Sequence, residues 1–261
     1  MRRRLLWILV GLAGAYLLIA YVILPSIWRH YEHQPALEKS PKFTVTDAGI
    51  PGDPLNVGLV GSQEEVLAAF AAAGWRVPAA LGFRSDIGIA ESVVADRPDP
   101  TAPLSQLFLF GRPEDLAFEK EAGQSADRRN HVRFWRDDAL GDGLRPFWIG
   151  AATFDAGVGI SHRTGQITHH IAPDIDAERD RVMDDLTAAR QLAERYQVTG
   201  IGPTLDGRNG GGDRYYTDGE LDVGVLIEGN QKRLHAPAVL PNPEGVQLKE
   251  RVWKWIEPML R

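Results

Sequence analysis

Hydrophobic and polar residues divide the chain into one long apolar run and a series of shorter segments behind it. Residues 5–24 contain no charged side chain. As a helix this run is about 30 Å long, the thickness of a bilayer's hydrocarbon core. Trp7 near one end and Tyr21 near the other suit the two membrane interfaces. The pattern predicts a transmembrane anchor over residues 1–24, with the lipid bilayer as its partner through residues 5–24.

A cleaved signal peptide is the competing interpretation of this run. Signal peptides have an apolar stretch of about 7–15 residues followed by small residues at the cleavage site. The run here is longer, and the segment Ile23-Leu-Pro-Ser-Ile27 matches such a site poorly. The sequence therefore favours an anchor that stays on the mature chain.

Basic residues on either side of the anchor indicate its orientation. Residues 2–4 are all arginine and directly precede the run, whereas Arg29, Lys39 and Lys42 follow at a greater distance. Positively charged flanks tend to stay in the cytoplasm. We expect a single-pass protein of the cytoplasmic (inner) membrane, with its N-terminus inside and its domain outside the cytoplasm.

Prolines mark a linker between the anchor and the folded part of the chain. The linker is predicted over residues 25–54, and its prolines would stiffen it and keep the domain away from the membrane. A folded domain is expected over residues 55–196. Residues 197–261 are expected to form a C-terminal extension packed on or beside that domain.

Capping residues locate the first two helices of the folded part. Ser62 and Glu65 form a capping-box pattern at the start of a helix over residues 62–73. Asp174 is a suitable N-cap for a long, charged helix over residues 175–196. Both helices carry an apolar side, which we expect to pack on a sheet.

The last part of the chain predicts one further helix, which begins near residues 242–244. Trp253 and Trp255 lie on different sides of this helix, so one of them should be exposed. Before it, residues 207–212 read as a flexible loop and residues 215–228 as a pair of strands.

Apolar or alternating segments typical of strands occupy the region between the first two helices. They are residues 85–94, 104–110, 131–135, 147–160 and 167–171. Turn residues separate several of them, as in antiparallel connections. The predicted fold class is α+β, an antiparallel or mixed sheet packed with helices and preceded by one transmembrane helix.

Composition excludes several classes of function. The chain has 29 Lys and Arg against 35 Asp and Glu, and the part behind residue 33 holds 25 of the former and 34 of the latter. Such an acidic domain repels phosphate backbones, so we expect no nucleic-acid partner. The chain has no cysteine, which excludes disulfides, thiol catalysis and thiolate zinc sites.

Several uncommon segments occur in an order that resembles a known family. They are Gly74-Trp75, Pro103-Leu-Ser-Gln-Leu-Phe-Leu-Phe-Gly-Arg-Pro-Glu-Asp-Leu-Ala-Phe-Glu-Lys120, Arg128-Arg-Asn-His-Val-Arg-Phe-Trp135, Phe147-Trp-Ile-Gly-Ala-Ala-Thr-Phe-Asp155 and Thr168-His-His-Ile-Ala-Pro-Asp-Ile-Asp-Ala-Glu-Arg-Asp180. Over about residues 50–195 this order resembles the LssY C-terminal domain family of bacterial envelope proteins.

The resemblance implies a cellular context and no defined activity. Domains of this family are often joined to membrane-embedded segments, including lipid-phosphatase-like ones. The Ser-Gly-His signature of those phosphatases is absent here, so their chemistry is not transferred to this chain. An envelope protein is a further expected partner.

Histidine and carboxylate residues are the candidates for catalysis, because such pairs serve as general acids, bases or metal ligands. The candidate catalytic residues are His131, Asp155 and His170. On a strand over residues 167–171, His169 and His170 point to opposite faces, so only one of them can join a given site. No spacing such as HExxH occurs. We therefore favour histidines hydrogen-bonded in or beside the sheet, and we predict no metal site and no cofactor.

Two arginines are candidates for ligand binding. Arg112 precedes a predicted turn and helix start at Asp115, where an anion could bind. Arg133 shares a strand face with His131 and Trp135 and could hold a phosphate or carboxylate. Salt bridging within this acidic domain is the favoured interpretation for Arg133.

Two functions remain open at this point. The preferred hypothesis is a membrane-anchored envelope domain of unknown activity that binds a ligand or a partner. The alternative is a hydrolase-type enzyme, acting on phosphoesters or lipid-related substrates, that uses His131, Asp155 and one of His169 and His170. The alternative requires these side chains to converge in one concave pocket.

Overall fold

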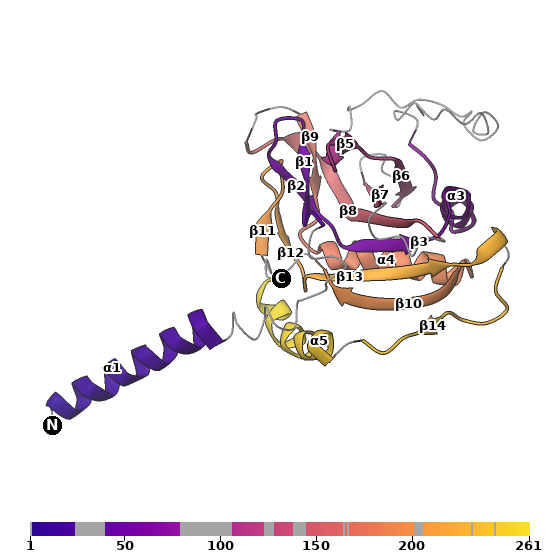
Figure 1. The fold of residues 1–261 in the computed structure, drawn as a ribbon. Helices are drawn as coiled ribbons and strands as arrows, with labels where there is room; N and C mark the ends of the chain where they lie inside the picture. The colour runs from indigo at the N-terminus through magenta and orange to yellow at the C-terminus, as the bar shows by residue number, and fades with distance from the viewer. Residues whose placement is uncertain are drawn as a thin grey trace.

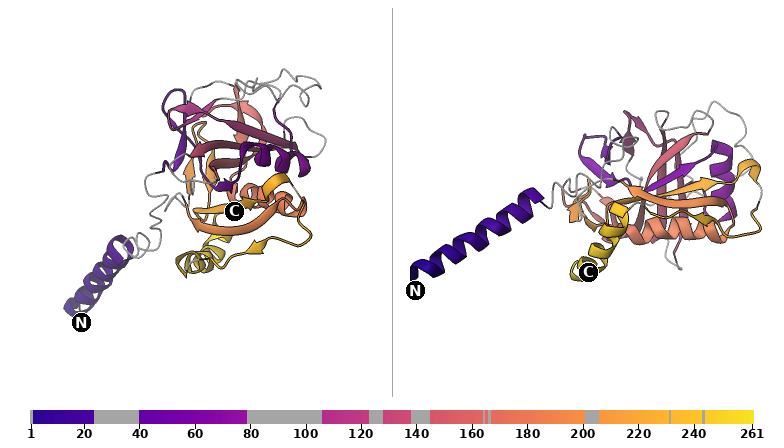
Figure 2. Two further views of the ribbon diagram at one scale, coloured as in Figure 1. Left: turned by 45° about the vertical axis from the view of Figure 1, so that its right-hand side comes forward. Right: turned by 60° about the horizontal axis from the view of Figure 1, so that its bottom comes forward.

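A computed structural model gives the structure of most of the chain (Figures 1 and 2). It describes residues 2–23, 40–78, 106–122, 128–137, 145–163, 165, 167–200, 206–230, 232–242 and 244–261. The predicted strand over residues 85–94 lies outside the described residues, as do Leu24 of the predicted anchor and residues 25–39 of the predicted linker.

The helices, in chain order, are α1 (Arg2–Leu18), continued by the π-helical turn η1 (Ile19–Ile23), then α3 (Gln63–Ala72), α4 (Ile175–Ala188) and α5 (Glu244–Ile256), with 3-10 turns η3 (Glu228–Asn230) and η4 (Glu257–Met259). The strands are β1 (Phe43–Thr46), β2 (Pro51–Pro54), β3 (Val57–Val60), β4 (Leu107–Leu109), β5 (Arg112–Pro113), β6 (Leu116–Glu121), β7 (Arg129–Asp137), β8 (Phe147–Ile160), β9 (Ile167–Ile171), β10 (Leu192–Thr199), β11 (Asp206–Arg208), β12 (Arg214–Tyr216), β13 (Glu220–Leu226) and β14 (Ala238–Val239).

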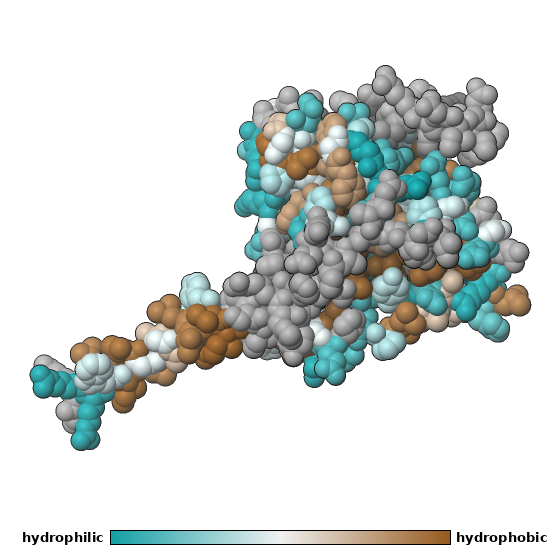
Figure 3. Space-filling model, viewed as in Figure 1, coloured by the Kyte–Doolittle hydropathy of each residue, from teal (hydrophilic) through white to brown (hydrophobic). Residues whose placement is uncertain are grey.

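The N-terminal helix is long and apolar enough to cross a membrane. The candidate membrane span runs from Arg3 to Ile23; its most apolar part has a mean hydropathy of 2.3 and is not buried against the rest of the chain. Figure 3 shows hydrophobic side chains along the helix and hydrophilic ones at its N-terminal end. These properties fit a membrane anchor, and a signal sequence shares them.

An eight-stranded mixed sheet forms the centre of the folded domain. Its strand order is β14-β10-β13-β3-β8-β7-β6, and β9 also pairs with β8. β13 lies parallel to β3, and β14 lies parallel to β10, while the other neighbours are antiparallel. The predicted α+β class with a mixed sheet is therefore confirmed.

Two apolar cores lie on either side of this sheet. Helices α3 and α4 cover one face, where Phe70, Phe118, Phe134 and Trp148 are buried together. Phe70 stacks on Phe118 with ring centroids 4.0 Å apart. The smaller sheet β2-β1-β4-β5 contributes β4 to the second core, which contains Trp135.

Local capping explains where the two central helices begin. The hydroxyl of Ser62 accepts a hydrogen bond from the backbone N–H of Glu65, whose carboxylate accepts from the N–H of Ser62. The Asp174 carboxylate accepts from the N–H of Ala177. The predicted capping box and the predicted N-cap are both confirmed, because each depends only on residues three apart.

The second predicted helix ends earlier than its charge pattern indicates. Helix α4 stops at Ala188, Arg190 adopts a left-handed φ of 59°, and residues 192–199 form β10. The prediction of helix from 189 to 196 was wrong. Tyr196 and Val198 pack against the second core, a contact that a continued helix could not make.

The folded domain also has wider limits than the predicted division of the chain. Residues 43–46 and 51–54, placed in the linker by their prolines, are strands β1 and β2. Behind residue 196, β13 lies inside the large sheet, between β10 and β3. The two strands predicted within residues 215–228 were expected to form a pair. Strand β12 pairs with β11 instead of with β13.

Candidate functional site

The predicted residues His131 and Asp155 lie in a buried polar layer on β7 and β8. Arg129 connects this layer: its guanidinium donates to Asp155 at 3.1 Å and to Glu119 at 3.1 Å. The same guanidinium lies 3.1 Å from Nε2 of His169. The charge of Asp155 is thus balanced by that of Arg129, and the histidine beside Asp155 is His169.

His131 is enclosed within this layer. Burial is the main cause that lowers its pKa well below the ordinary value, and the charges of Arg133 and Arg129 lower it further. Within the part of the chain that the structure describes, its Nε2 has no hydrogen-bond partner. A neutral, enclosed imidazole cannot reach a substrate in solution.

The two arginine candidates are held by carboxylates of the domain itself. Arg133 lies 3.8 Å from Asp53 and 3.5 Å from Glu114, which is the salt bridging favoured for it. Arg112 donates to both carboxylate oxygens of Asp115, at 3.1 and 2.7 Å. The helix predicted at Asp115 was wrong, because strand β6 begins at Leu116, so Arg112 is not beside a helix N-terminus.

A second polar group lies at the far end of β8 and β9, and it combines His162, His170 and Asp213. One ligand atom of each residue lies within 4.8 Å of the other two. Nδ1 of His170 is 2.6 Å from Oδ1 of Asp213, and Nε2 of His162 is 3.9 Å from the same oxygen. The Asp213 side chain is buried, whereas that of His162 is 66% exposed. We call these three residues the His–His–Asp cluster.

Backbone contacts hold the cluster in place. The N–H of Ile171 donates to Oδ2 of Asp213, and the N–H of Asp213 donates to the side chain of Asn209. The N–H of His162 donates to the carbonyl of Gly211, which fastens the β8–β9 turn to the loop before β12. The carboxylate is therefore positioned before any ligand arrives.

Two glycines leave room for the imidazole side chains. A Cβ on Gly159 would lie 2.4 Å from Nε2 of His170. A Cβ on Gly212, which has a φ of 92°, would lie 2.8 Å from Cβ of His162. Any larger residue at either position would displace a histidine of the cluster.

The structure separates His170 from the other two candidate catalytic residues, His131 and Asp155, which lie in the buried layer. His170 contacts Asp213, while His169 faces Asp155, as expected for neighbours that alternate across a strand. Sequence reasoning named His170 but missed Asp213. No local signal marks it, because Asp213 follows a glycine-rich stretch and lies 43 positions from its partner.

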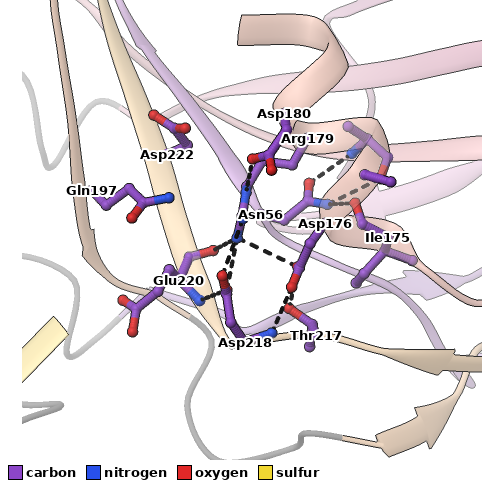
Figure 4. A network of polar contacts seen from close by, with 12 residues as sticks. Asn56, Ile175, Asp176, Arg179, Asp180, Gln197, Thr217, Asp218, Glu220 and Asp222 are labelled. Atoms are coloured by element: carbon purple, nitrogen blue, oxygen red, sulfur yellow. Dashed lines mark hydrogen bonds and ion pairs between the residues drawn. The ribbon is translucent and has the colours of Figure 1, made fainter. Parts of the chain in front are cut away.

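A third polar group, shown in Figure 4, joins α4 to the segment that leads into β13. Arg179 is 3% exposed and donates to Asp218 at 2.7 and 3.1 Å, and it also contacts Asp176 and Asp180. Burial raises the pKa of Asp176 to about 7 despite the neighbouring Arg179. Asn56, in the same view, bonds to the backbone of Ala152 and Ile175. Apart from Asp180, whose side chain is partly exposed, these groups are enclosed, and we assign them to the packing of α4.

Comparison with protein-family models gives a match to the family described as LssY C-terminus over residues 37–221. The match covers well over half of the 261 residues. The chain belongs to the LssY C-terminus family. No curated protein and no solved structure matches it.

The LssY C-terminus match agrees with the resemblance seen in the sequence and extends it at both ends. The matched range includes β1 and β2 and reaches the first residues of β13. All three residues of the His–His–Asp cluster lie within the LssY C-terminus domain. Helices α1 and α5 lie outside it.

Proposed function

We propose that the protein is a membrane-anchored ligand-binding module of the cell envelope, and that its ligand is a divalent transition-metal ion. One observation carries this proposal: the ligand atoms of the His–His–Asp cluster lie within 4.8 Å of one another beside solvent. The buried layer around His131 has no such access. We therefore favour binding over the hydrolase alternative.

The donor set of the cluster defines the class of ion. Imidazole nitrogens suit zinc, copper, nickel and iron, and one carboxylate adds a negative charge. Sites with three protein ligands keep a further position open for water or another ligand. The exposed side of His162 is where that position would face solvent.

The short contact between His170 and Asp213 has to change when an ion binds. Two ligands at about 2.0–2.1 Å from a tetrahedral ion are about 3.3 Å apart. Nδ1 of His170 and Oδ1 of Asp213 are 2.6 Å apart and are joined by a hydrogen bond. An ion bound to both atoms would break this hydrogen bond and move the atoms apart by a further distance of less than about 1 Å. Because histidine and carboxylate ligands bind a metal only when deprotonated, binding should weaken as the pH falls.

A titration of the untagged, full-length chain in detergent micelles with Zn²⁺ tests the site. We expect one ion per chain by calorimetry. The loss of one ligand in His170→Ala or Asp213→Asn should weaken binding by at least about 10–100-fold, the effect that even outer-shell substitutions have. Asp213→Asn keeps the shape of the side chain, so a loss of Zn²⁺ binding in this variant reflects the lost metal ligand and not a disturbed fold.

The matched control is His235→Ala, because His235 is an exposed histidine outside the cluster. Its affinity for Zn²⁺ should equal that of the unchanged chain. Equal binding by all four proteins, or no binding by any of them, would refute the metal site. Circular dichroism of each variant verifies that the fold is retained.

We further propose that α1 anchors the chain in the cytoplasmic membrane, with the N-terminus inside and the domain outside. The length and hydropathy of residues 3–23 support an anchor, and the three arginines at residues 2–4 support the orientation. Alkaline phosphatase fused behind Arg261 should be active in intact cells, because this enzyme needs export. Replacing the three arginines by glutamate should lower that activity.

The same fusion distinguishes an anchor from a signal sequence. An anchor leaves the chain at its full mass in the membrane fraction, whereas cleavage releases a shorter chain. If the phosphatase were inactive and a fluorescent protein at the same position were bright, the domain would lie in the cytoplasm and the proposed orientation would be wrong.

A further inference from the structure

Helix α5 presents a narrow apolar stripe to solvent. The stripe consists of Leu248, Val252, Trp255 and Met259, all exposed, with Trp255 71% and Met259 70% exposed. The first three lie on α5 and Met259 lies in η4 directly behind it. With 3.6 residues per turn, positions i, i+4, i+7 and i+11 fall on one side of a helix. We call these four residues the α5 stripe.

The opposite side of α5 is fixed to the domain. Val246 and Lys249 are buried, and Nζ of Lys249 lies 2.8 Å from the Glu220 carboxylate of β13. The ring of Trp253 lies 6.4 Å from that of Tyr216. The prediction that one of the two tryptophans is exposed is therefore confirmed for Trp255. The α5 stripe cannot turn inward without breaking the buried ion pair.

Basic side chains border the α5 stripe, although the domain as a whole is acidic. Arg251 and Lys254 are exposed, and they lie on the helix side next to the stripe. Trp255 adds an amphipathic ring of the kind that is enriched at membrane interfaces. A helix with apolar residues on one side and basic residues beside them is typical of helices that lie in the plane of a membrane surface.

The chain itself limits how far the domain can be from a membrane. The stretch from residue 24 to residue 39 spans at most about 60 Å when fully extended. A domain on such a tether meets the membrane surface at a high effective concentration, so that a weak contact suffices to hold it.

We infer that α5 docks on the surface of a lipid bilayer, with the α5 stripe inserted among the headgroups and with Arg251 and Lys254 near anionic lipid. This inference rests on the proposed anchor and is independent of the metal site. A second copy of the chain fits less well. Four side chains cover little of the roughly 1,200 Å² of a stable interface, and two acidic domains repel each other.

Single-cysteine variants test this contact, because the chain has no cysteine of its own. The full-length chain with Met259→Cys is labelled with a fluorophore and reconstituted into vesicles of phosphatidylcholine and phosphatidylglycerol. Some of the lipids carry a spin label near the headgroup that quenches the fluorophore. We expect strong quenching at position 259. Glu64→Cys, on the exposed side of α3, is the matched control and should show at least about fivefold less quenching.

Adding Trp255→Glu to the Met259→Cys chain tests the role of the α5 stripe. Because Trp255 is exposed, the fold should survive, and quenching at position 259 should fall to the level of the Glu64→Cys control. Equal quenching at positions 259 and 64, or quenching that persists with Trp255→Glu, overturns the inference. If the emission of the label changes with the number of chains per vesicle but is not quenched by the spin-labelled lipids, a second copy of the chain covers the α5 stripe. That result also overturns the inference. Flotation of the chain with the vesicles shows separately whether α1 anchors the chain in the bilayer.

Discussion

Arg179→Met is expected to lower the free energy of unfolding by about 3–5 kcal/mol, the usual cost of removing one partner from a buried ion network. Asp218 accepts two hydrogen bonds from this guanidinium, at 2.7 and 3.1 Å, and would lose both. Asp176 and Asp180 would lose the same cation. Methionine fills a similar volume without replacing any of these bonds.

The loss should depend on pH, because one of the carboxyls titrates near neutrality. The pKa of Asp176 is raised by burial to about 7. At pH 5 this group is protonated and needs no cation, so removing Arg179 costs less there. At pH 8 it is charged, so the variant should be least stable on the alkaline side.

Urea unfolding of the full-length chain in detergent measures both effects. The buried Trp135 and Trp148 supply the fluorescence signal. The control is Arg214→Met, which removes an exposed ion pair with Asp206 and should cost less than about 1 kcal/mol. If the two variants were equally stable, the network around Arg179 would not be what holds α4 to the sheet.

Glu178→Gln is expected to stabilise the protein at alkaline pH, by about 2–4 kcal/mol at pH 8. Burial raises the pKa of Glu178 to about 9; Arg181 opposes this shift, while Asp185 and Asp155 add to it. Among the described residues, its Oε1 has no hydrogen-bond partner. Glutamine has the same shape and carries no charge to bury.

The sign follows from proton binding. Between about pH 4.5 and pH 9 the folded chain keeps the proton on Glu178, while the unfolded chain has released it. The unfolded state then binds fewer protons, so the stability of the unchanged chain falls as the pH rises through this window. The variant lacks this contribution. The two proteins should be similar near pH 5 and should diverge toward pH 8.

The same urea titrations, performed at pH 5 and pH 8, measure this divergence. Glu64→Gln, an exposed change on α3, controls for the loss of one negative charge and should track the unchanged chain at both values. A stability difference between Glu178→Gln and the unchanged chain that stays constant from pH 5 to pH 8 would mean that Glu178 is ionised in the folded protein.

Elements defined by close neighbours in the sequence could be predicted. The helix behind Ser62 follows from a capping box whose two members, Ser62 and Glu65, are three positions apart. Strands β8 and β9 have the predicted bounds because apolar runs and flanking turn residues delimit them locally. Such signals depend on the chain within a few residues, and distant contacts do not change them.

Elements that depend on distant partners could not be predicted. Residues 192–196 contain Glu194 and Arg195 and read as a charged helix, yet Arg195 bonds to Asp222 of β13. Pro51 and Pro54 read as linker, yet β2 is an edge strand, where a missing backbone N–H is tolerated. In both places a pairing formed elsewhere in the fold overrides the local preference.

In the candidate site, too, the local features could be predicted and the distant contacts could not. The alternation of His169 and His170 follows from strand geometry, and the structure gives each its own partner. The partner of His170 could not be predicted, because Asp213 reaches it only through the β11–β12 hairpin. The glycine-rich stretch before Asp213 carries no periodicity that would place it.

The position of β13 inside the large sheet has a consequence for biosynthesis. β13 is made after β3 through β9, yet it lies between β3 and β10 and forms hydrogen bonds with both. When β3 through β9 have left the ribosome, β3 still exposes a row of unpaired backbone groups. Open edges of this kind recruit other strands. The nascent chain therefore stays aggregation-prone until residues 220–226 have been made, because the large sheet cannot close between β3 and β10 without them.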